Sequence, residues 1–208
     1  PQTGHFECPH RIDAGIRVCM ICDLRRPKCS TTLQRILVAM NAYDFPTDER
    51  LRELAEQVAD KARQHRLMVV TAESCTGGWI AKVLTDLPGS SAWFEAGAVA
   101  YSYEAKEALL GVNPRTLERF GAVSEETALE MVSGALARFG AGVAVAVTGI
   151  AGPSGGTPDK PVGTVWIAWK RRGGYAHARL FHFDGDRDAV RRLTVAAALT
   201  GTWQELTP

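Results

Sequence analysis

From residue 46 onward, the hydrophobic positions alternate between helical spacing and short continuous runs that are typical of buried strands. Pro46-Thr47-Asp48-Glu49 predicts a helix start, with Thr47 as the N-cap and two acidic residues favoured by the helix dipole. The apolar residues of this helix recur on one face, namely Leu51, Leu54, Ala55, Val58 and Ala62. The run over residues 67–71 then predicts a strand, which leads through a turn into a helix from Thr76 to about Leu84.

The same alternation continues through the rest of the chain. Further strands are expected over residues 93–103, 141–147, 161–169 and 176–183. Further helix starts are expected at residues 104, 114, 125 and 187. The last two strands are separated by the turn at residues 171–174, which predicts an antiparallel hairpin. The pattern as a whole therefore predicts an α/β fold built on an open sheet.

Composition excludes some partners. The 208 residues are 46% hydrophobic, enough for one substantial domain plus an appendage. Lys and Arg number 24 against 23 Asp and Glu, so the charge balance implies neither a nucleic acid nor an anionic membrane as partner. No apolar run approaches the roughly 20 residues of a membrane span, and the first residues lack the order of a secretory signal. We expect a reduced, cytoplasmic protein.

Residues 1–46 look unlike the rest of the chain, and we interpret them as a variable extension, with one domain over residues 47–208. The alternative is a zinc site that supports a nucleic-acid adaptor, formed from Cys8, His10, Cys19, Cys22 and Cys29. Only one close pair, Cys19-x-x-Cys22, is present, whereas a zinc ribbon needs two. We therefore expect no metal.

The turn after the first strand, Glu73-Ser-Cys-Thr-Gly-Gly78, is the strongest candidate for a site. In an open α/β sheet, ligands bind at the carboxyl ends of strands, where helix N-termini converge. Gly77 and Gly78 permit close approach, and free backbone N–H groups could hold an anion or a developing oxyanion. Taken alone, Ser74 or Thr76 is explained equally well as a helix cap.

Three other segments carry candidate chemistry. Lys106 lies on the first turn of a short helix, beside the phenol of Tyr101. The segment 148–156 contains glycines that include Gly149 and Gly152, although it matches neither a P-loop nor a dinucleotide fingerprint. Arg187 opens the last helix, where a cation opposes the helix dipole unless it faces an anion. A salt bridge to a neighbouring aspartate is an equally good explanation.

Six motifs resemble, in order and spacing, the C-terminal domain of the competence/damage-inducible protein CinA, the nicotinamide mononucleotide deamidase family. They are Thr71-Ala-Glu-Ser-Cys-Thr-Gly-Gly78, Tyr101-Ser-x-x-Ala-Lys106, Gly121-Ala-Val-Ser124, Thr148-Gly-Ile-Ala-Gly-Pro153, Pro161-Val-Gly-Thr-Val165 and Gly185-Asp-Arg187. The resemblance covers about residues 48–206. It implies a three-layer α/β/α sandwich with a mixed, mostly parallel sheet.

The resemblance also implies a reaction, in which nicotinamide mononucleotide and water give nicotinate mononucleotide and ammonia without a metal or organic cofactor. It places catalytic roles on Ser74, Tyr101, Lys106 and Thr148. We assign substrate binding to Cys75, Thr76, Gly77, Gly149, Gly152 and Arg187. A homo-oligomer is expected. Some family members carry a further N-terminal domain, for which this chain has no room.

Our mechanistic hypothesis is that Ser74 attacks the carboxamide carbon while neutral Lys106 takes its proton, and Tyr101 orients the lysine or relays the proton. Backbone N–H groups of Cys75 and Thr76, with Thr148, would stabilise the oxyanion. Two rivals stay open: Cys75 as nucleophile, and Glu73 as a base that activates water directly. The alternative outside catalysis is a silent nucleotide-binding or regulatory module of the same fold.

Overall fold

The computed structural model describes residues 45–207, which fold around one five-stranded sheet. The strands are β1 (Val69–Glu73), β2 (Phe94–Val99), β3 (Val143–Gly149), β4 (Thr164–Arg171) and β5 (His177–His182). The helices are α2 (Asp48–His65), α3 (Trp79–Thr85), α4 (Tyr103–Leu110), α5 (Pro114–Phe120), α6 (Glu125–Phe139), α7 (Arg187–Leu206) and the short 3-10 helix η1 (Ser90–Ala92). The residues of the zinc alternative lie outside this described part of the chain.

The sheet has the strand order β2-β1-β3-β4-β5, and its two halves differ in direction. β1 pairs in parallel with β2 and with β3, whereas β4 pairs antiparallel with β3 and with β5. Only β4 therefore runs against the other described strands, and the predicted mixed, mostly parallel sheet is confirmed. The β4–β5 hairpin forms where the sequence predicted it, around the turn after Arg171.

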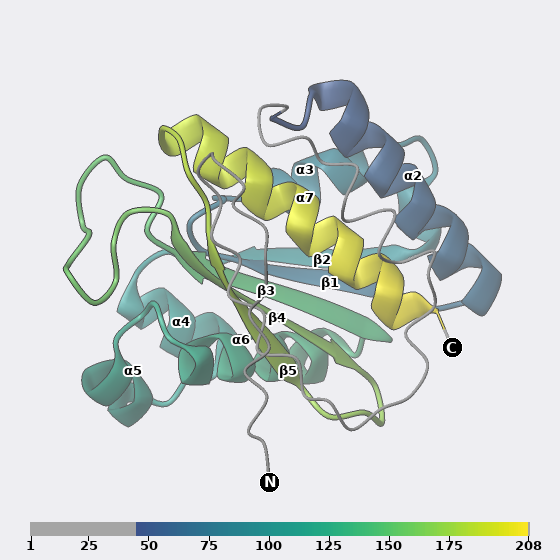
Figure 1. The fold of residues 1–208 in the computed structure, drawn as a ribbon. Helices are drawn as coiled ribbons and strands as arrows, with labels where there is room; N and C mark the ends of the chain where they lie inside the picture. Colours follow the sequence, from purple (N-terminus) through teal and green to yellow (C-terminus); the bar gives the residue numbers. More distant parts are fainter. Residues whose placement is uncertain (1–44, 208) are drawn as a thin grey trace, which may run out of the picture. The chain divides into compact units, whose positions relative to one another are not determined.

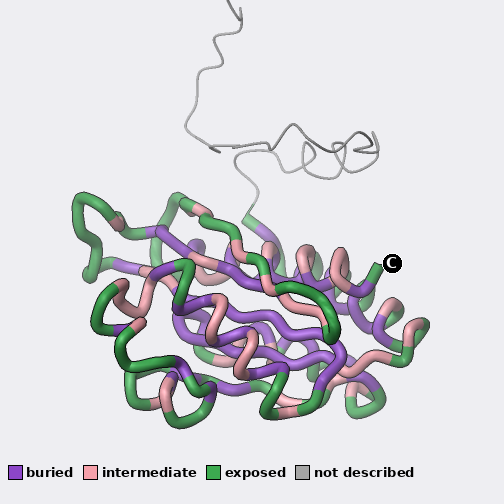
Figure 2. Tube along the Cα trace, turned by 90° about the horizontal axis from the view of Figure 1, so that it is seen from below, coloured by how far each residue is buried: buried purple, intermediate pink, exposed green. Residues whose placement is uncertain are grey.

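Helices cover both faces of the sheet and make the three layers visible in Figure 1: α2, α3 and α7 on one face, and α4, α5 and α6 on the other. The strands between them form the buried centre of the tube in Figure 2. β3 is buried from Val143 to Thr148, as expected for a strand enclosed by two helical layers.

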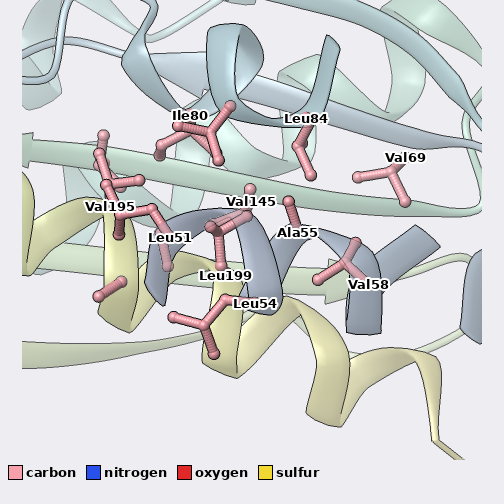
Figure 3. Close-up of a cluster of buried hydrophobic side chains, with 14 of the residues drawn as sticks. Leu51, Leu54, Ala55, Val58, Val69, Ile80, Leu84, Val145, Val195 and Leu199 are labelled. Atoms are coloured by element: carbon pink, nitrogen blue, oxygen red, sulfur yellow. The ribbon is translucent and has the colours of Figure 1, made fainter. Parts of the chain in front are cut away.

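Each helical layer has its own apolar core. Residues of α2, α3 and α7 pack with alternate side chains of the strands, and Figure 3 shows Leu51, Ile80, Val145 and Leu199 converging in this cluster. The opposite cluster joins α6 to the other set of strand side chains, including Val70 and the small residues of β3. This division follows from the strand period, since successive side chains point to opposite faces of the sheet.

Side-chain caps fix the helix starts that the sequence predicted. Thr47 accepts a hydrogen bond from the N–H of Arg50, and Ser124 accepts one from the N–H of Thr127. Asn113 caps α5 in the same way. Each cap satisfies a backbone donor that the first helical turn leaves without an acceptor.

The structure differs from the prediction at the turn after β1. The strand extends to Glu73, and α3 begins at Trp79, not at Thr76. Gly77 and Gly78 adopt φ values of 63° and 94°, which delay the start of the helix. Residues 74–78 thus form an irregular turn at the carboxyl end of β1. Within the described residues, no helix has the length and apolarity needed to cross a membrane.

Candidate active site

A pocket of about 180 Å³ lies at the carboxyl ends of the neighbouring strands β1 and β3. It is lined by Ser74, Cys75, Tyr101, Lys106, Ala122, Val123, Thr148, Gly149, Ala151 and Arg187. The topology brings these residues together because parallel strands end at the same edge of a sheet. All four residues that the sequence marked as catalytic line this pocket.

Lys106 meets Ser74 inside the pocket, although 32 residues separate them in the chain. The Nζ atom of Lys106 lies 3.0 Å from Ser74 Oγ, 2.9 Å from the carbonyl oxygen of Ala100 and 3.1 Å from that of Tyr101. Lys106 is fully buried and Ser74 is 8% exposed. The two carbonyl groups belong to the segment between β2 and α4, so the first turn of α4 directs the lysine back across the end of the sheet.

Burial lowers the pKa of the Lys106 amine below the ordinary lysine value of 10.5, and only a smaller effect of Cys75 opposes this shift. No carboxylate forms a salt bridge with Lys106 among residues 45–207. A neutral amine has two N–H donors and one lone pair. In the neutral form, the two carbonyl groups would take both donors and the lone pair would face the Ser74 hydroxyl, so the contacts are compatible with a general base.

Cys75 is a poor rival nucleophile in this environment. Burial raises the pKa of its thiol to about 12, so the reactive thiolate is disfavoured near neutral pH. The residue still lines the pocket beside Ser74. The raised pKa therefore argues against the Cys75 thiolate as the attacking group.

The contacts of Glu73 do not support its alternative role as a base that activates water. Its buried carboxylate accepts hydrogen bonds from Thr71 Oγ1, Thr76 Oγ1 and the N–H groups of Gly78, Ile80 and Ala81. These donors surround both oxygens at distances of 2.7 to 3.2 Å. The carboxylate thus caps α3 and fixes the turn, and it does not line the pocket where a water would have to be activated.

Two backbone N–H groups of the turn, at Cys75 and Thr76, have no acceptor among residues 45–207, and of the two residues only Cys75 lines the pocket, whereas Thr76 is fully buried. The N–H of Gly77 is already used, because it donates to the carbonyl of Ser74 at 3.1 Å. The N–H groups of Cys75 and Thr76 donate to no other residue in the range 45–207. Of the three backbone positions assigned to substrate binding here, Cys75 and Thr76 keep available donors and Gly77 does not.

Thr148 and Tyr101 line the pocket with contacts that the sequence did not predict. The Thr148 hydroxyl donates its proton to the carbonyl of Ala122 at 2.6 Å, so it is not a free oxyanion donor. The phenol of Tyr101 is exposed and accepts from Arg187 at 3.3 Å, whereas only the backbone carbonyl of Tyr101 contacts Lys106. The expected orientation of the lysine is therefore provided by main-chain atoms and not by the phenol.

Arg187 lies at the pocket with most of its hydrogen-bonding capacity free. It donates to the carbonyl of Gly152 at 2.9 Å and to the Tyr101 phenol, whereas a guanidinium has five N–H donors. The alternative explanation for Arg187 was a salt bridge to a neighbouring aspartate. Arg187 forms no salt bridge among the described residues, and Asp188 pairs with Arg192 instead. Gly152 thus positions Arg187 through its carbonyl, and Gly149 lines the pocket as the last residue of β3.

Two side chains that support this site were not predicted from the sequence. Arg191 of α7 donates to the carbonyls of Cys75 and Thr76, more than a hundred residues away. Lys160 donates to the carbonyls of Phe120 and Val123 and so fixes the wall of the pocket. Neither residue belongs to a recognisable motif, because each acts on distant main-chain carbonyls. Within residues 45–207, no group of three or more His, Cys, Asp or Glu side chains is arranged to hold a metal ion.

The fold and the pocket define a three-layer α/β/α protein with a buried serine–lysine pair. The chain belongs to the CinA C-terminal domain family, whose model matches residues 51–206. It is 53% identical over 159 residues to the nicotinamide-nucleotide amidohydrolase PncC of Escherichia coli K12. The aligned region covers 76% of this chain and 96% of that protein. It is 54% identical over 151 residues to PncC of Pseudomonas putida, with 73% of this chain and 94% of that protein covered.

Solved structures agree with this assignment. The competence/damage-inducible protein CihA of Agrobacterium tumefaciens superposes with a TM-score of 0.70 at 49% identity, over 76% of this chain and 95% of that one. A CinA-superfamily protein of Klebsiella pneumoniae superposes with a TM-score of 0.72 at 38% identity, over 75% of this chain and 97% of that one. The predicted family and fold class are confirmed.

The capping role of Glu73 can be tested by Glu73→Gln. The amide places an NH2 group where an oxygen now accepts backbone N–H groups, so the free energy of unfolding should fall by about 1–3 kcal/mol. Urea unfolding followed by circular dichroism measures the change. Glu95→Gln on the exposed side of β2 is the control and should leave the midpoint unchanged. Identical unfolding curves for Glu73→Gln and the unsubstituted protein would show that the carboxylate does not hold the turn.

Proposed function

We propose that this protein hydrolyses the carboxamide of nicotinamide mononucleotide to nicotinate mononucleotide and ammonia. The observation that carries the proposal is the 3.0 Å contact between Lys106 Nζ and Ser74 Oγ in a pocket at the end of the sheet. The printed names of the relatives, nicotinamide-nucleotide amidohydrolase, support this substrate class. The lowered pKa of the buried, carbonyl-bound Lys106 supports its role as a base.

In the proposed reaction, Ser74 Oγ forms a bond to the carboxamide carbon while its proton passes to neutral Lys106. The negative charge that develops on the carbonyl oxygen is stabilised by the N–H groups of Cys75 and Thr76. When the intermediate collapses, the C–N bond breaks and the Lys106 ammonium returns the proton to the leaving nitrogen, which departs as ammonia. Lys106 then takes a proton from a water whose oxygen bonds to the ester carbon. When the C–O bond to Ser74 breaks, Lys106 returns this proton to Ser74 Oγ, and nicotinate mononucleotide is released.

The size of the pocket suits the reacting part of the substrate. A protein cavity of about 150 Å³ accepts a benzene molecule, so a pocket of about 180 Å³ suits a pyridine ring with a carboxamide group. The ribose and phosphate would then extend toward the mouth of the pocket. Arg187 lies there with free N–H donors, and a guanidinium forms strong, charge-assisted hydrogen bonds with phosphate.

The setting of the reaction is also a proposal. We place it in the cytoplasm, because the buried free thiol of Cys75 beside the nucleophile suits a reducing compartment. A homo-oligomer remains an expectation.

Two substitutions at adjacent positions distinguish the nucleophile. Ser74→Ala should reduce ammonia release from nicotinamide mononucleotide by at least about 10³-fold, because no covalent intermediate can form. Cys75→Ser should retain activity within about tenfold, because the thiol is protonated and does not attack. An enzyme-coupled ammonia assay measures both variants. Full activity of Ser74→Ala would overturn the serine mechanism.

The lysine base predicts a definite pH dependence. Because only the neutral amine accepts the serine proton, kcat/KM should rise with pH as one proton is lost and then reach a plateau. The midpoint of the rise should lie below 10.5, in the direction that burial shifts the pKa of Lys106. Lys106→Met should be inactive across the range. A rise centred at or above 10.5 would contradict a desolvated lysine base.

The phosphate-binding role of Arg187 can be tested with a matched pair of substrates. The enzyme should prefer nicotinamide mononucleotide over nicotinamide riboside, which lacks the phosphate, and over free nicotinamide. Arg187→Gln should raise KM for the mononucleotide by roughly 10- to 100-fold and leave the slow reaction of the riboside unchanged. Ammonia release with each substrate measures the difference. An equal effect on both substrates would show that Arg187 does not bind the phosphate.

A further inference from the structure

Arg191 lies outside the pocket and holds the turn that carries Ser74. It lies on α7 one helical turn beyond Arg187, and it is partly buried. Its Nε donates to the carbonyl of Cys75 at 3.2 Å, and its Nη2 donates to the carbonyl of Thr76 at 2.7 Å. One guanidinium therefore fixes two consecutive peptide groups of the turn.

The direction of a carbonyl determines the direction of the next N–H group. A trans peptide is planar, so the C=O of Cys75 and the N–H of Thr76 point to opposite sides of the chain. When Arg191 holds the Cys75 carbonyl, the Thr76 N–H is turned away from α7. In the preceding peptide, the Gly77 N–H holds the Ser74 carbonyl and fixes the Cys75 N–H in the same manner.

The turn is thus fixed by opposite charges acting on opposite groups. The carboxylate of Glu73 takes the N–H groups that follow the turn, at Gly78, Ile80 and Ala81. The guanidinium of Arg191 takes the carbonyls within it. Neither of these side chains binds the N–H groups of Cys75 and Thr76, and in the proposed reaction these are the two donors to the developing oxyanion.

We propose that Arg191 is a positioning residue for the oxyanion-binding N–H groups and does not touch the substrate. It acts on the Thr76 N–H through the Cys75 carbonyl. It acts on the Cys75 N–H less directly, because the Thr76 carbonyl that it holds shares a peptide with the Gly77 N–H that donates to the Ser74 carbonyl. This inference deepens the proposed amide hydrolysis and rests on it. Without Arg191 the two peptides can rotate, so the donors lose their fixed direction. Interactions made only in the transition state affect kcat and leave KM unchanged, and this separates Arg191 from a substrate-binding residue.

The test compares Arg191 with its neighbour Arg192. Both guanidiniums lie over the Trp79 ring, at 5.1 and 4.9 Å from its centroid, but Arg192 bonds to Asp48 and the carbonyl of Pro46 and not to the turn. Arg191→Gln should lower kcat by roughly 10- to 100-fold with KM within about twofold. Arg191→Lys should recover part of the loss, because an ammonium can still hold one carbonyl. Arg192→Gln should leave kcat within about twofold.

A second readout does not depend on the natural substrate. A fluorophosphonate reacts when Ser74 Oγ bonds to phosphorus, fluoride leaves and the Oγ proton passes to Lys106, and its phosphoryl oxygen needs the same N–H donors. Intact-protein mass spectrometry measures the rate of this labelling, which Arg191→Gln should slow at least tenfold relative to Arg192→Gln. Thermal unfolding of both variants shows whether their stabilities match.

The outcomes separate the two proposals. Labelling that is normal in the unsubstituted protein and slow in Arg191→Gln, without hydrolysis of nicotinamide mononucleotide, would overturn the substrate assignment and support the positioning role. Equal losses in Arg191→Gln and Arg192→Gln would reduce Arg191 to a structural residue and overturn the inference. Unchanged kcat and labelling in Arg191→Gln would overturn it as well. An unsubstituted protein that neither labels nor hydrolyses would overturn both proposals.

Discussion

The burial of one amine without a carboxylate partner is the constraint on which the site depends. A charged ammonium would be costly in this environment, since Lys106 is fully buried and its polar contacts are two carbonyls and one hydroxyl. The neutral form satisfies all three contacts, and it is the form that can accept a proton. The same burial that disfavours the charged lysine therefore supports its proposed role as a base.

This constraint fixes the surrounding architecture. The carbonyls that bind the amine come from the segment that joins the edge strand β2 to α4, and the serine comes from the turn after β1. β1 and β2 are parallel neighbours, so the two segments leave the sheet side by side. The base arises from the helical layer of α4 and α6, and the guanidiniums arise from α7 in the opposite layer. The pocket is lined by residues from both helical layers, which Figure 1 shows on opposite faces of the sheet.

Much of the fold and part of the site were predictable from local sequence. The features that were not predictable share a physical cause. The caps at Thr47 and Ser124, the β4–β5 hairpin and the buried β3 follow from short-range patterns, because each depends on neighbouring residues. The motifs also led to Ser74 and Lys106. The roles of Glu73 and Arg191 did not follow, since they bind main-chain groups whose directions exist only in the folded turn. The position of the Tyr101 phenol was unpredictable for the same reason.

The spacing of Arg187 and Arg191 on α7 has a consequence for anyone who redesigns this enzyme. Residues four apart lie on one face of a helix, so a single rigid body carries both the contact at the mouth of the pocket and the contact behind the turn. Repacking the underside of α7 to shift it along its axis would displace both guanidiniums together. With the roles proposed for these two arginines, affinity for a new substrate and turnover of that substrate are coupled through one helix.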